Sequence, residues 1–200
     1  MRLLLALALS VGLALPAAAD TAQPIDALRG PVEQVLAILK DPRYSAAATK
    51  KEQRDHLWEI IRGVFDYRAI SARAVGRNWR LFDPGQQQAF TDAFSELLGN
   101  SYLSRIQGAY KNERVEFLGQ ELLENGTARV KSRIVRDADA IAVDYSLQRE
   151  AGAWKVYDVN IAGVSLVQNY RSQFDQILGE GTPAQLIERV KAKNSAQAEK

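Results

Sequence analysis

The chain contains a single histidine, His56, and no cysteine, which narrows the chemistry that its side chains could perform. A Ser-His-Asp triad would have to use His56 as its base, and thiol chemistry is excluded. His56 follows the charged run 50–55, and no nucleophile or acid stands beside it in a recognisable motif. We therefore expect a solvated or half-packed histidine and a protein that is not an enzyme.

The segment Gly163-Val164-Ser165 is the nearest approach to a catalytic serine motif. It lacks the final glycine of a nucleophile elbow, and it precedes a predicted helix for which Ser165 makes a natural N-cap. The sequence also contains no glycine-rich loop of the kind that cradles phosphates. We expect a structural role for this segment.

Two carboxylates, Asp144 and Asp158, lie within predicted strands and could face one another across a sheet. Strand alternation instead predicts that both point to solvent while their neighbours point inward. Asp137 and Asp139 lack the dense oxygen ligands of a calcium loop, so we expect no metal and no cofactor. A small exported enzyme with an acidic cavity remains one alternative, and it requires a perturbed pKa for Asp144 or Asp158.

The N-terminus has the three parts of a secretory signal peptide. Arg2 precedes an apolar run over 3–15, and the small residues 17–19 form an Ala-x-Ala cleavage site. The run is shorter than the roughly 20 residues of a membrane-spanning helix, and no nearby cysteine could carry a lipid anchor. We expect residues 1–19 to be a signal peptide, cleaved after Ala19 on export to the periplasm.

The remaining residues fit one domain of ordinary size. We expect a single domain over 20–194 and a flexible polar tail over 195–200. The formal net charge is only +2, so nothing indicates a nucleic-acid partner. Without cysteine, packing alone has to stabilise the fold.

Helical periodicity fills the first half of the chain and returns at its end. Two helix starts are marked by a capping residue, a proline and a glutamine: Asp83-Pro84 with Gln86, and Thr182-Pro183 with Gln185. The apolar stripes predict helices over 28–39, 57–74, 84–110, 167–178 and 183–190.

Between the helical segments the apolar period changes to two. Alternation predicts strands near 115–117, 128–134, 141–147 and 154–161, and Asn125-Gly126 and Ala151-Gly152 are turn signals. Consecutive strands with short turns form an antiparallel meander. We therefore predict an α+β fold in which helices pack on one face of a four-stranded antiparallel sheet.

Apolar and aromatic side chains are spread over both the helical segments and the strands. A packed core accounts for this pattern, but a ligand cavity would produce the same stripes. A third possibility is an interaction or chaperone module with a filled core and an exposed apolar groove.

Two blocks of sequence carry a resemblance to a known family. The first comprises Trp154-x-x-Tyr157-Asp158, Gly163-Val164-Ser165, Asn169-Tyr170-Arg171 and Phe174. The second comprises Ala74-Val75-Gly76-Arg77, Trp79, Pro84, Gln87, Phe90, Phe94 and Tyr102. Both resemble the MlaC, or toluene-tolerance, family, and with the order of elements the resemblance covers nearly the whole mature chain. Ala162 departs from the acidic residue that many members carry there.

The resemblance implies a soluble periplasmic phospholipid carrier. Such a carrier moves diacyl lipids between an outer-membrane lipoprotein and porin complex and an inner-membrane ABC transporter with its substrate-binding subunit. The exchange maintains the lipid asymmetry of the outer membrane. The resemblance also implies a pocket between the sheet and the helices.

We predict that this pocket is lined by the inward face of the sheet and the apolar stripes of the facing helices. The predicted lining residues are Val75, Phe90, Phe94, Leu98, Tyr102, Val130, Ile134, Val143, Tyr145, Val156 and Val164. A charged headgroup should stay at the pocket mouth in water. Arg77 and Arg171 are candidate mouth residues, although ion pairing or helix capping would equally account for them.

Overall fold

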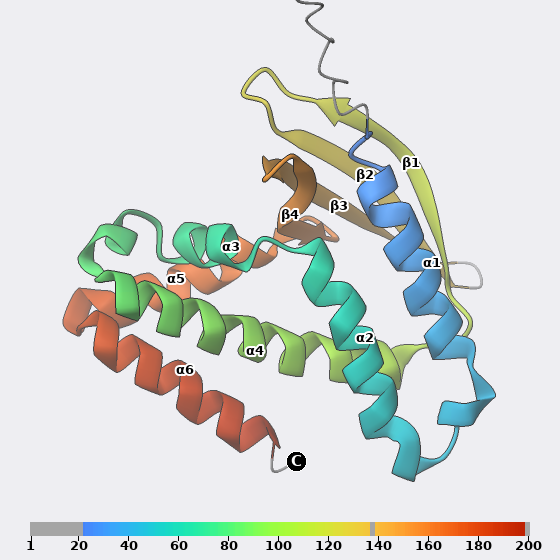
Figure 1. The fold of residues 1–200 in the computed structure, drawn as a ribbon, viewed down its shortest axis with the longest axis horizontal. Helices are drawn as coiled ribbons and strands as arrows, with labels where there is room; N and C mark the ends of the chain where they lie inside the picture. The colour runs from blue at the N-terminus through green and yellow to red at the C-terminus, as the bar shows by residue number, and fades with distance from the viewer. Residues whose placement is uncertain (1–21, 137–138, 199–200) are drawn as a thin grey trace, which may run out of the picture.

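The structure is a computed structural model that describes residues 22–136 and 139–198. It is an α+β fold in which six α-helices accompany one antiparallel sheet (Figure 1). The predicted fold class is confirmed. The predicted signal peptide, 1–19, and Asp137 lie outside the described residues.

The helices occupy both ends of the described chain, and short 3-10 turns separate some of them. They are α1 (Asp26–Lys40), α2 (Lys50–Val64), α3 (Tyr67–Val75), α4 (Pro84–Ala109), α5 (Leu166–Glu180) and α6 (Pro183–Ala198), with 3-10 turns at Pro42–Tyr44, Ala47–Thr49 and Gly76–Leu81.

The sheet is a meander in which each strand pairs with the next, in the order β1-β2-β3-β4-β5. The strands are β1 (Arg114–Leu122), β2 (Ala128–Arg136), β3 (Asp139–Glu150), β4 (Ala153–Ile161) and β5 (Val164–Ser165). Our prediction of four strands missed β5. It is only two residues long, and it returns from β4 through the tight turn Ala162-Gly163, where both residues have positive φ.

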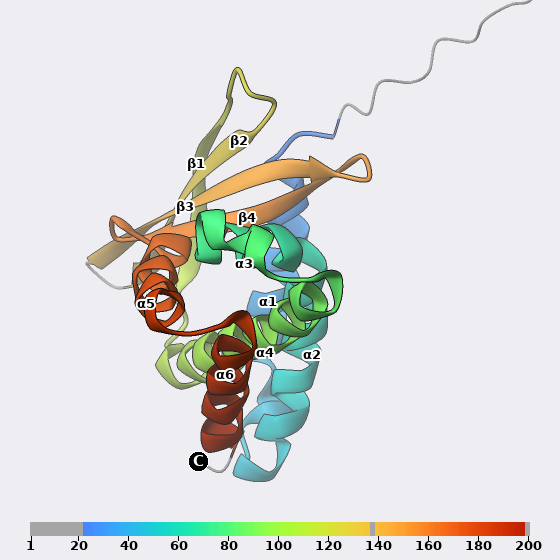
Figure 2. The same cartoon turned by 90° about the vertical axis from the view of Figure 1, so that its left-hand side faces the viewer.

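The helices lie on one side of the sheet (Figure 2). Helix α1 crosses the sheet face, α3 and α5 lie beside β4, and α4 and α6 run side by side farther from the strands. Side chains on the opposite sheet face are mostly polar and include Arg129, Lys131 and Arg133, which are exposed. The face toward the helices is therefore the one that holds the apolar core.

The helix predicted over 57–74 is divided in two. Phe65 is extended and forms a bridge with Val156 of β4. The next residue, Asp66, donates its N–H to the Val156 carbonyl and accepts from the Ala69 N–H at 2.8 Å, so that it caps α3. The single-helix prediction was wrong because the apolar spacing continues across the break while the backbone does not.

The two predicted capping boxes are confirmed. Asp83 accepts from the Gln86 N–H at 2.8 Å and Gln86 accepts from the Asp83 N–H at 3.1 Å. Thr182 and Gln185 make the equivalent pair of hydrogen bonds at the start of α6.

The segment from Ser195 is helical as far as Ala198, where our prediction has the start of a flexible tail over 195–200, and residues 199–200 lie outside the described residues. Two side chains hold the end of α6 against α4. Asn194 is buried and donates to the Ala93 carbonyl at 2.9 Å, and Gln197 donates to the Ser101 hydroxyl at 3.2 Å. These contacts join segments that are about half the chain apart, which the polar composition of the tail does not reveal.

Candidate functional site

The sheet face toward the helices carries an apolar cluster, which we call the inner sheet face. Its fully buried members come from β2, β3 and β4, and Leu28 of α1 packs on them. Register explains the grouping, because Val130 lies opposite Tyr145 and Leu147 lies opposite Val156. Directly opposite residues point to the same side of a sheet. The cluster comprises Leu28, Ala128, Val130, Val143, Leu147, Trp154, Val156 and Val159.

Part of this face is only half covered. Phe117, Ile134 and Tyr145 pack against the buried cluster but keep part of their surface accessible. We call these three residues the half-covered patch. It lies on three adjacent strands, since Phe117 pairs with Ser132 of β2 and Ile134 pairs with Ile141 of β3. Apolar surface in this position is available to an additional apolar group.

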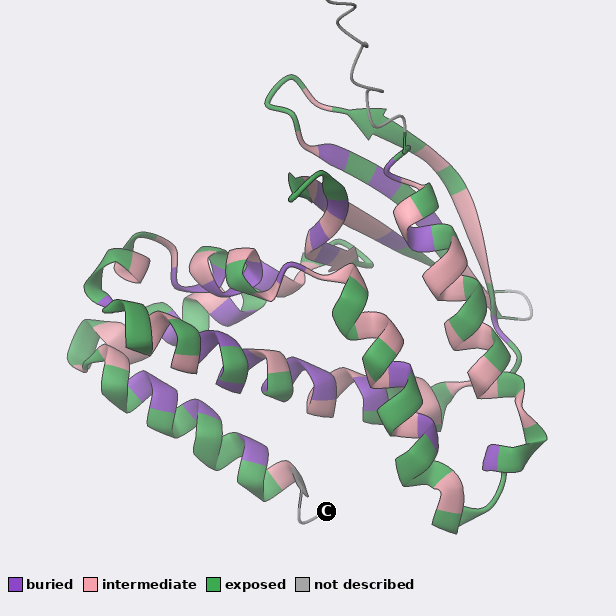
Figure 3. Ribbon diagram, viewed as in Figure 1, coloured by how far each residue is buried: buried purple, intermediate pink, exposed green. Residues whose placement is uncertain are grey.

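Helix α1 covers the sheet incompletely. Among its 15 residues only Leu28 is buried, whereas Val32, Val35 and Leu36 of its apolar stripe are half-buried. Figure 3 shows the contrast with α4, along which buried residues recur. An amphipathic helix usually buries its apolar stripe. The stripe of α1 therefore keeps part of its apolar surface accessible.

A second apolar cluster, the helical cluster, is built from α3, α4, α5 and α6. Its centre is a group of aromatic rings in close contact, with centroids 5.6 Å apart for Phe90 and Phe94 and 4.8 Å apart for Phe94 and Tyr170. Phe174 contacts both phenylalanines, and all four rings are buried. This cluster is a closed core.

The predicted pocket residues divide between these two clusters. Val75, Phe90, Phe94 and Leu98 belong to the helical cluster, and Tyr102 packs against it. The sheet residues of the prediction lie on the inner sheet face: Val130, Ile134, Val143, Tyr145 and Val156. The helical members are thus packed mainly against other helices, and the sheet members are the ones that border the half-covered patch.

Val164 belongs to neither cluster, contrary to its place in the predicted lining. It lies in β5 and its side chain is 62 % exposed. The tight turn at Ala162-Gly163 folds this residue back beside Ile161 at the end of β4.

The polar groups within the inner sheet face are few and neutral. The Ser132 hydroxyl is buried and donates to the Val143 carbonyl at 3.0 Å. Burial raises the pKa of the Tyr145 phenol, so it remains protonated at neutral pH. A largely apolar surface of this kind suits hydrocarbon.

The two candidate mouth arginines have different surroundings. Arg171 is half-buried, and its guanidinium donates to the carbonyl of Arg73 at the end of α3 through both Nε, at 3.0 Å, and Nη2. It acts as a cap for that helix, which was one of the alternatives left open by the sequence. Arg77 is exposed in the 3-10 turn after α3.

The carboxylates considered for catalysis do not face one another. Asp144 pairs with Asn160, and Asp158 pairs with Ser146. Asp158 is half-buried and accepts hydrogen bonds from the Ser165 hydroxyl at 2.6 Å and the Val167 N–H at 3.0 Å. These bonds attach the start of α5 to β4, which is a structural use of the carboxylate.

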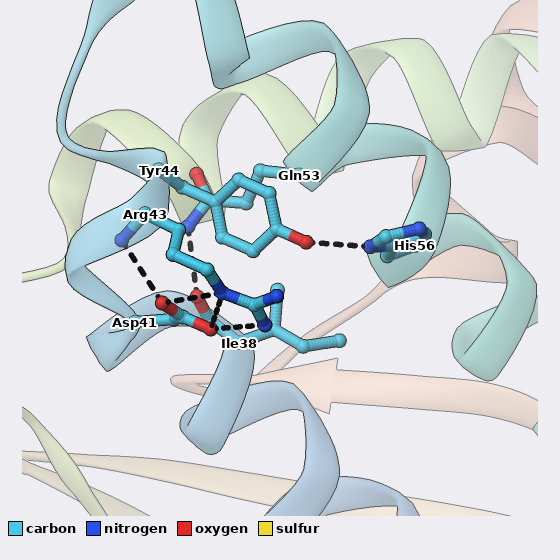
Figure 4. A network of polar contacts seen from close by, with 6 residues as sticks. All are labelled: Ile38, Asp41, Arg43, Tyr44, Gln53 and His56. Carbon is cyan, nitrogen blue, oxygen red and sulfur yellow. Dashed lines mark hydrogen bonds and ion pairs between the residues drawn. The ribbon is translucent and has the colours of Figure 1, made fainter.

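His56 is part of a network at the connection between α1 and α2 (Figure 4). The buried Tyr44 hydroxyl lies 2.7 Å from His56 Nδ1, and Gln53 donates to the Ile38 carbonyl at 2.9 Å. His56 itself is exposed. Within residues 22–136 and 139–198, no group of three or more acidic or histidine side chains could hold a metal ion.

A surface groove of about 470 Å³ separates α2 from α4. Its lining combines the charged side chains of Arg54, Arg62, Asp92 and Glu96 with those of Trp58, Tyr67 and Leu103. Charged side chains of both signs make this groove unfavourable for acyl chains, which would displace their water without offering hydrogen bonds. We therefore place the candidate site at the inner sheet face.

Sequence reasoning missed two contributors to the site. Phe65 packs against both clusters, and its position was hidden by the helical spacing that continues through it. Phe117 belongs to the half-covered patch, with the Arg29 guanidinium 5.4 Å from its ring centre. Alternation puts Val115 and Phe117 on the same face of β1, but it does not show which face of the strand points toward the helices.

Comparison with known proteins bears on this site. The profile of the MlaC protein family matches residues 30–192. The chain belongs to the MlaC family. It is 26 % identical over 153 residues to the toluene tolerance protein ttg2D of Pseudomonas putida, a match that covers 76 % of this chain and 71 % of that protein. A solved phospholipid-binding protein from Ralstonia solanacearum, in complex with a phospholipid, superposes with a TM-score of 0.75 and 27 % identity, covering 88 % of this chain and 99 % of that one.

The residues that resemble the MlaC signature connect elements rather than line an open site. The Asp158–Ser165 bond joins the Trp-x-x-Tyr-Asp strand to the Gly-Val-Ser turn. The Arg171 guanidinium packs 3.5 Å from the position of a Cβ at Gly76, where φ is +56°. Glycine is favoured there because an L side chain rarely adopts that backbone conformation. The two MlaC blocks therefore fix α3 and α5 beside the sheet.

None of the helices in the described part of the chain combines the length and the apolar character needed to cross a membrane.

Proposed function

We propose that this protein binds a diacyl phospholipid with its acyl chains against the inner sheet face. The observation that carries the proposal is the half-covered patch of Phe117, Ile134 and Tyr145 on the face that the helices enclose. Its membership of the MlaC family and its similarity to a phospholipid-bound protein of the same fold support this choice of ligand.

An apolar protein surface can offset the free-energy cost of exposing acyl chains to water. Moving acyl chains into water costs about 0.8 kcal/mol for each exposed CH₂ group, so two chains of ordinary length cost on the order of 20 kcal/mol. The inner sheet face and the stripe of α1 offer a continuous apolar lining. The charged headgroup stays in water, because burying it without partners is unfavourable. Arg77 is exposed and remains a candidate headgroup contact, whereas Arg171 is committed to α3.

We further propose that the protein works as a soluble carrier in the periplasm. In this account residues 1–19 direct export and are removed after Ala19. The carrier then exchanges lipid between an outer-membrane lipoprotein and porin complex and an inner-membrane ABC transporter with its substrate-binding subunit. Transfer by exchange between similar apolar environments requires no chemical step, and the partners set its direction.

Mass spectrometry of organic extracts tests the proposed function. The full chain is expressed in a bacterial host, the mature protein is purified from the periplasm, and a lipid-free protein from the same compartment is extracted as the control. We expect near-stoichiometric diacyl phospholipid only from this protein. Lipid at the level of the control, even after incubation with phospholipid vesicles, would refute the proposal.

A further inference from the structure

Three of the large apolar side chains that are exposed in the described residues meet at one corner of the sheet. They are Ile141 at 47 % exposure, Ile161 at 39 % and Val164 at 62 %. Ile161 pairs directly with Val164, and Ile161 also pairs with Val143, two residues along β3 from Ile141. We call these three residues the apolar lip.

The apolar lip continues the inner sheet face outward. Ile141 lies opposite Ile134 of the half-covered patch, and Ile161 lies opposite the buried Val143, so both side chains point to the helix side of the sheet. Exposure rises along one row across the strands, from 3 % at Val143 to 39 % at Ile161 and 62 % at Val164. The row thus leads from the interior to solvent without a change to polar side chains.

The lip is held in a fixed shape. The Ala162 N–H donates to the Ala142 carbonyl at 2.9 Å, which closes the end of β4 onto β3. On the other side of the turn, Ser165 is fixed by its hydrogen bond to Asp158. A rigid, exposed apolar edge that adjoins an apolar interior indicates a contact site for another apolar surface.

We infer that the acyl chains of the bound phospholipid enter and leave the protein across the apolar lip. This inference rests on the proposed function. A chain that moves along the lip exposes fewer CH₂ groups to water at any moment than one that leaves through solvent, so the lip lowers the barrier to exchange. The lip contributes little to the affinity for the fully bound lipid, because its side chains lie at the exposed end of this row.

Leu122 provides a matched control at the diagonally opposite corner of the sheet. It is 67 % exposed, and it lies opposite the buried Ala128, so it also points to the helix side. It differs from the lip in lying on β1, the edge strand at the other end of the strand order from β5. A general effect of removing exposed apolar surface would appear at Leu122 as well.

The test compares lipid transfer rates of the double variant I161T/V164T with those of L122T and the unaltered protein. Threonine keeps the β-branched shape and removes apolar surface. Each protein is loaded with a phospholipid that carries a fluorescent acyl chain, and transfer to vesicles of phosphatidylethanolamine and phosphatidylglycerol in equal amounts is followed by stopped flow. Bound lipid per protein and the unfolding midpoint are measured on the same samples.

We expect the double variant to bind a full complement of lipid and to transfer it about tenfold more slowly, while L122T transfers at close to the unaltered rate. The conservative double variant I161L/V164I should keep the fast rate. An unchanged rate in I161T/V164T, or equal slowing in L122T, would overturn the lip as the route. So would loss of bound lipid from a folded double variant, because these side chains would then belong to the binding site.

An unaltered protein that carries no lipid would instead overturn the proposed function together with this inference.

Discussion

The helical cluster and the inner sheet face are built from the same kinds of side chain, but they are covered to different degrees. In the helical cluster, four aromatic rings at Phe90, Phe94, Tyr170 and Phe174 are all buried and contact one another. On the inner sheet face, α1 leaves the half-covered patch partly accessible. The difference separates a region that maintains the fold from a region that can accept a ligand.

Sequence alone cannot make this separation, because an apolar stripe looks the same whether it meets a neighbouring helix or a lipid. The sheet and the helices are also connected by specific polar contacts, so the inner sheet face need not be filled to keep the layers together. The bonds from Ser165 and Val167 to Asp158, and from Asp66 to the Val156 carbonyl, are examples. A fold that is attached at its edges can leave part of its interior for an exchangeable ligand.

The largest effect should come from truncating a ring of the helical cluster. Phe94 is fully buried and contacts three other rings, so Phe94→Ala should lower the free energy of unfolding by about 3–5 kcal/mol. Phe117→Ala, on the half-covered patch, should cost much less in the lipid-free protein, since its ring is only half-buried. Urea denaturation measures both. Equal losses would contradict the distinction between the two regions.

Larger side chains should have different effects in the helical cluster and on the half-covered patch. Leu98 lies in the closed cluster, so Leu98→Trp should lower stability by about 1–3 kcal/mol through overpacking. Ile134→Trp on the half-covered patch should instead be accommodated and should reduce the lipid bound per protein. Urea denaturation and phosphate analysis of extracts give the two quantities. The account fails if Ile134→Trp keeps full lipid while Leu98→Trp loses lipid without loss of stability.

The attachment between the layers can be weakened directly at Asp158. Asp158→Ala leaves the Val167 N–H without its acceptor and releases the Ser165 hydroxyl, and we expect a loss of about 1–2 kcal/mol. Asp144→Ala is the control, since the Asp144 carboxylate makes no hydrogen bond or ion pair within the described residues, and it should change stability by less than about 0.5 kcal/mol. Thermal unfolding compares the two. Similar losses would show that Asp158 has no special role.

The smallest effect should be a gain at the tight turn beside the apolar lip. Ala162 has a φ of +50°, a conformation that costs an L side chain about 1 kcal/mol. Ala162→Gly should therefore raise stability by up to about 1 kcal/mol. Asparagine and aspartate also tolerate this conformation better than alanine does. A fall in the unfolding temperature of Ala162→Gly would contradict this account of the turn.

Local signals in the sequence predicted much of the fold. Both capping boxes, the strand alternation and the Asn125-Gly126 and Ala151-Gly152 turns depend on neighbouring residues, and these elements were predicted where the structure has them. The break at Phe65 and the short β5 were missed because each depends on pairing with β4, which no local pattern encodes. The helical end of the chain depends in the same way on contacts of α6 with α4.

The candidate site was less accessible to sequence reasoning than the fold. Alternation grouped Val130, Val143 and Tyr145 on one face, as the register has them. It could not show that α1 covers this face incompletely, because coverage depends on how far a helix stands from a sheet. It also could not show that Val164 turns back into solvent after the Ala162-Gly163 turn.

Photo-crosslinking tests the central claim most directly. The protein is loaded with a phospholipid that carries a diazirine in an acyl chain, irradiated, digested and analysed by mass spectrometry. The account predicts label on peptides that contain Phe117, Ile134 or Tyr145, and little on the α2–α4 groove around Arg54 and Glu96. Label confined to that groove, with none on the strands, would show that the lipid does not occupy the inner sheet face.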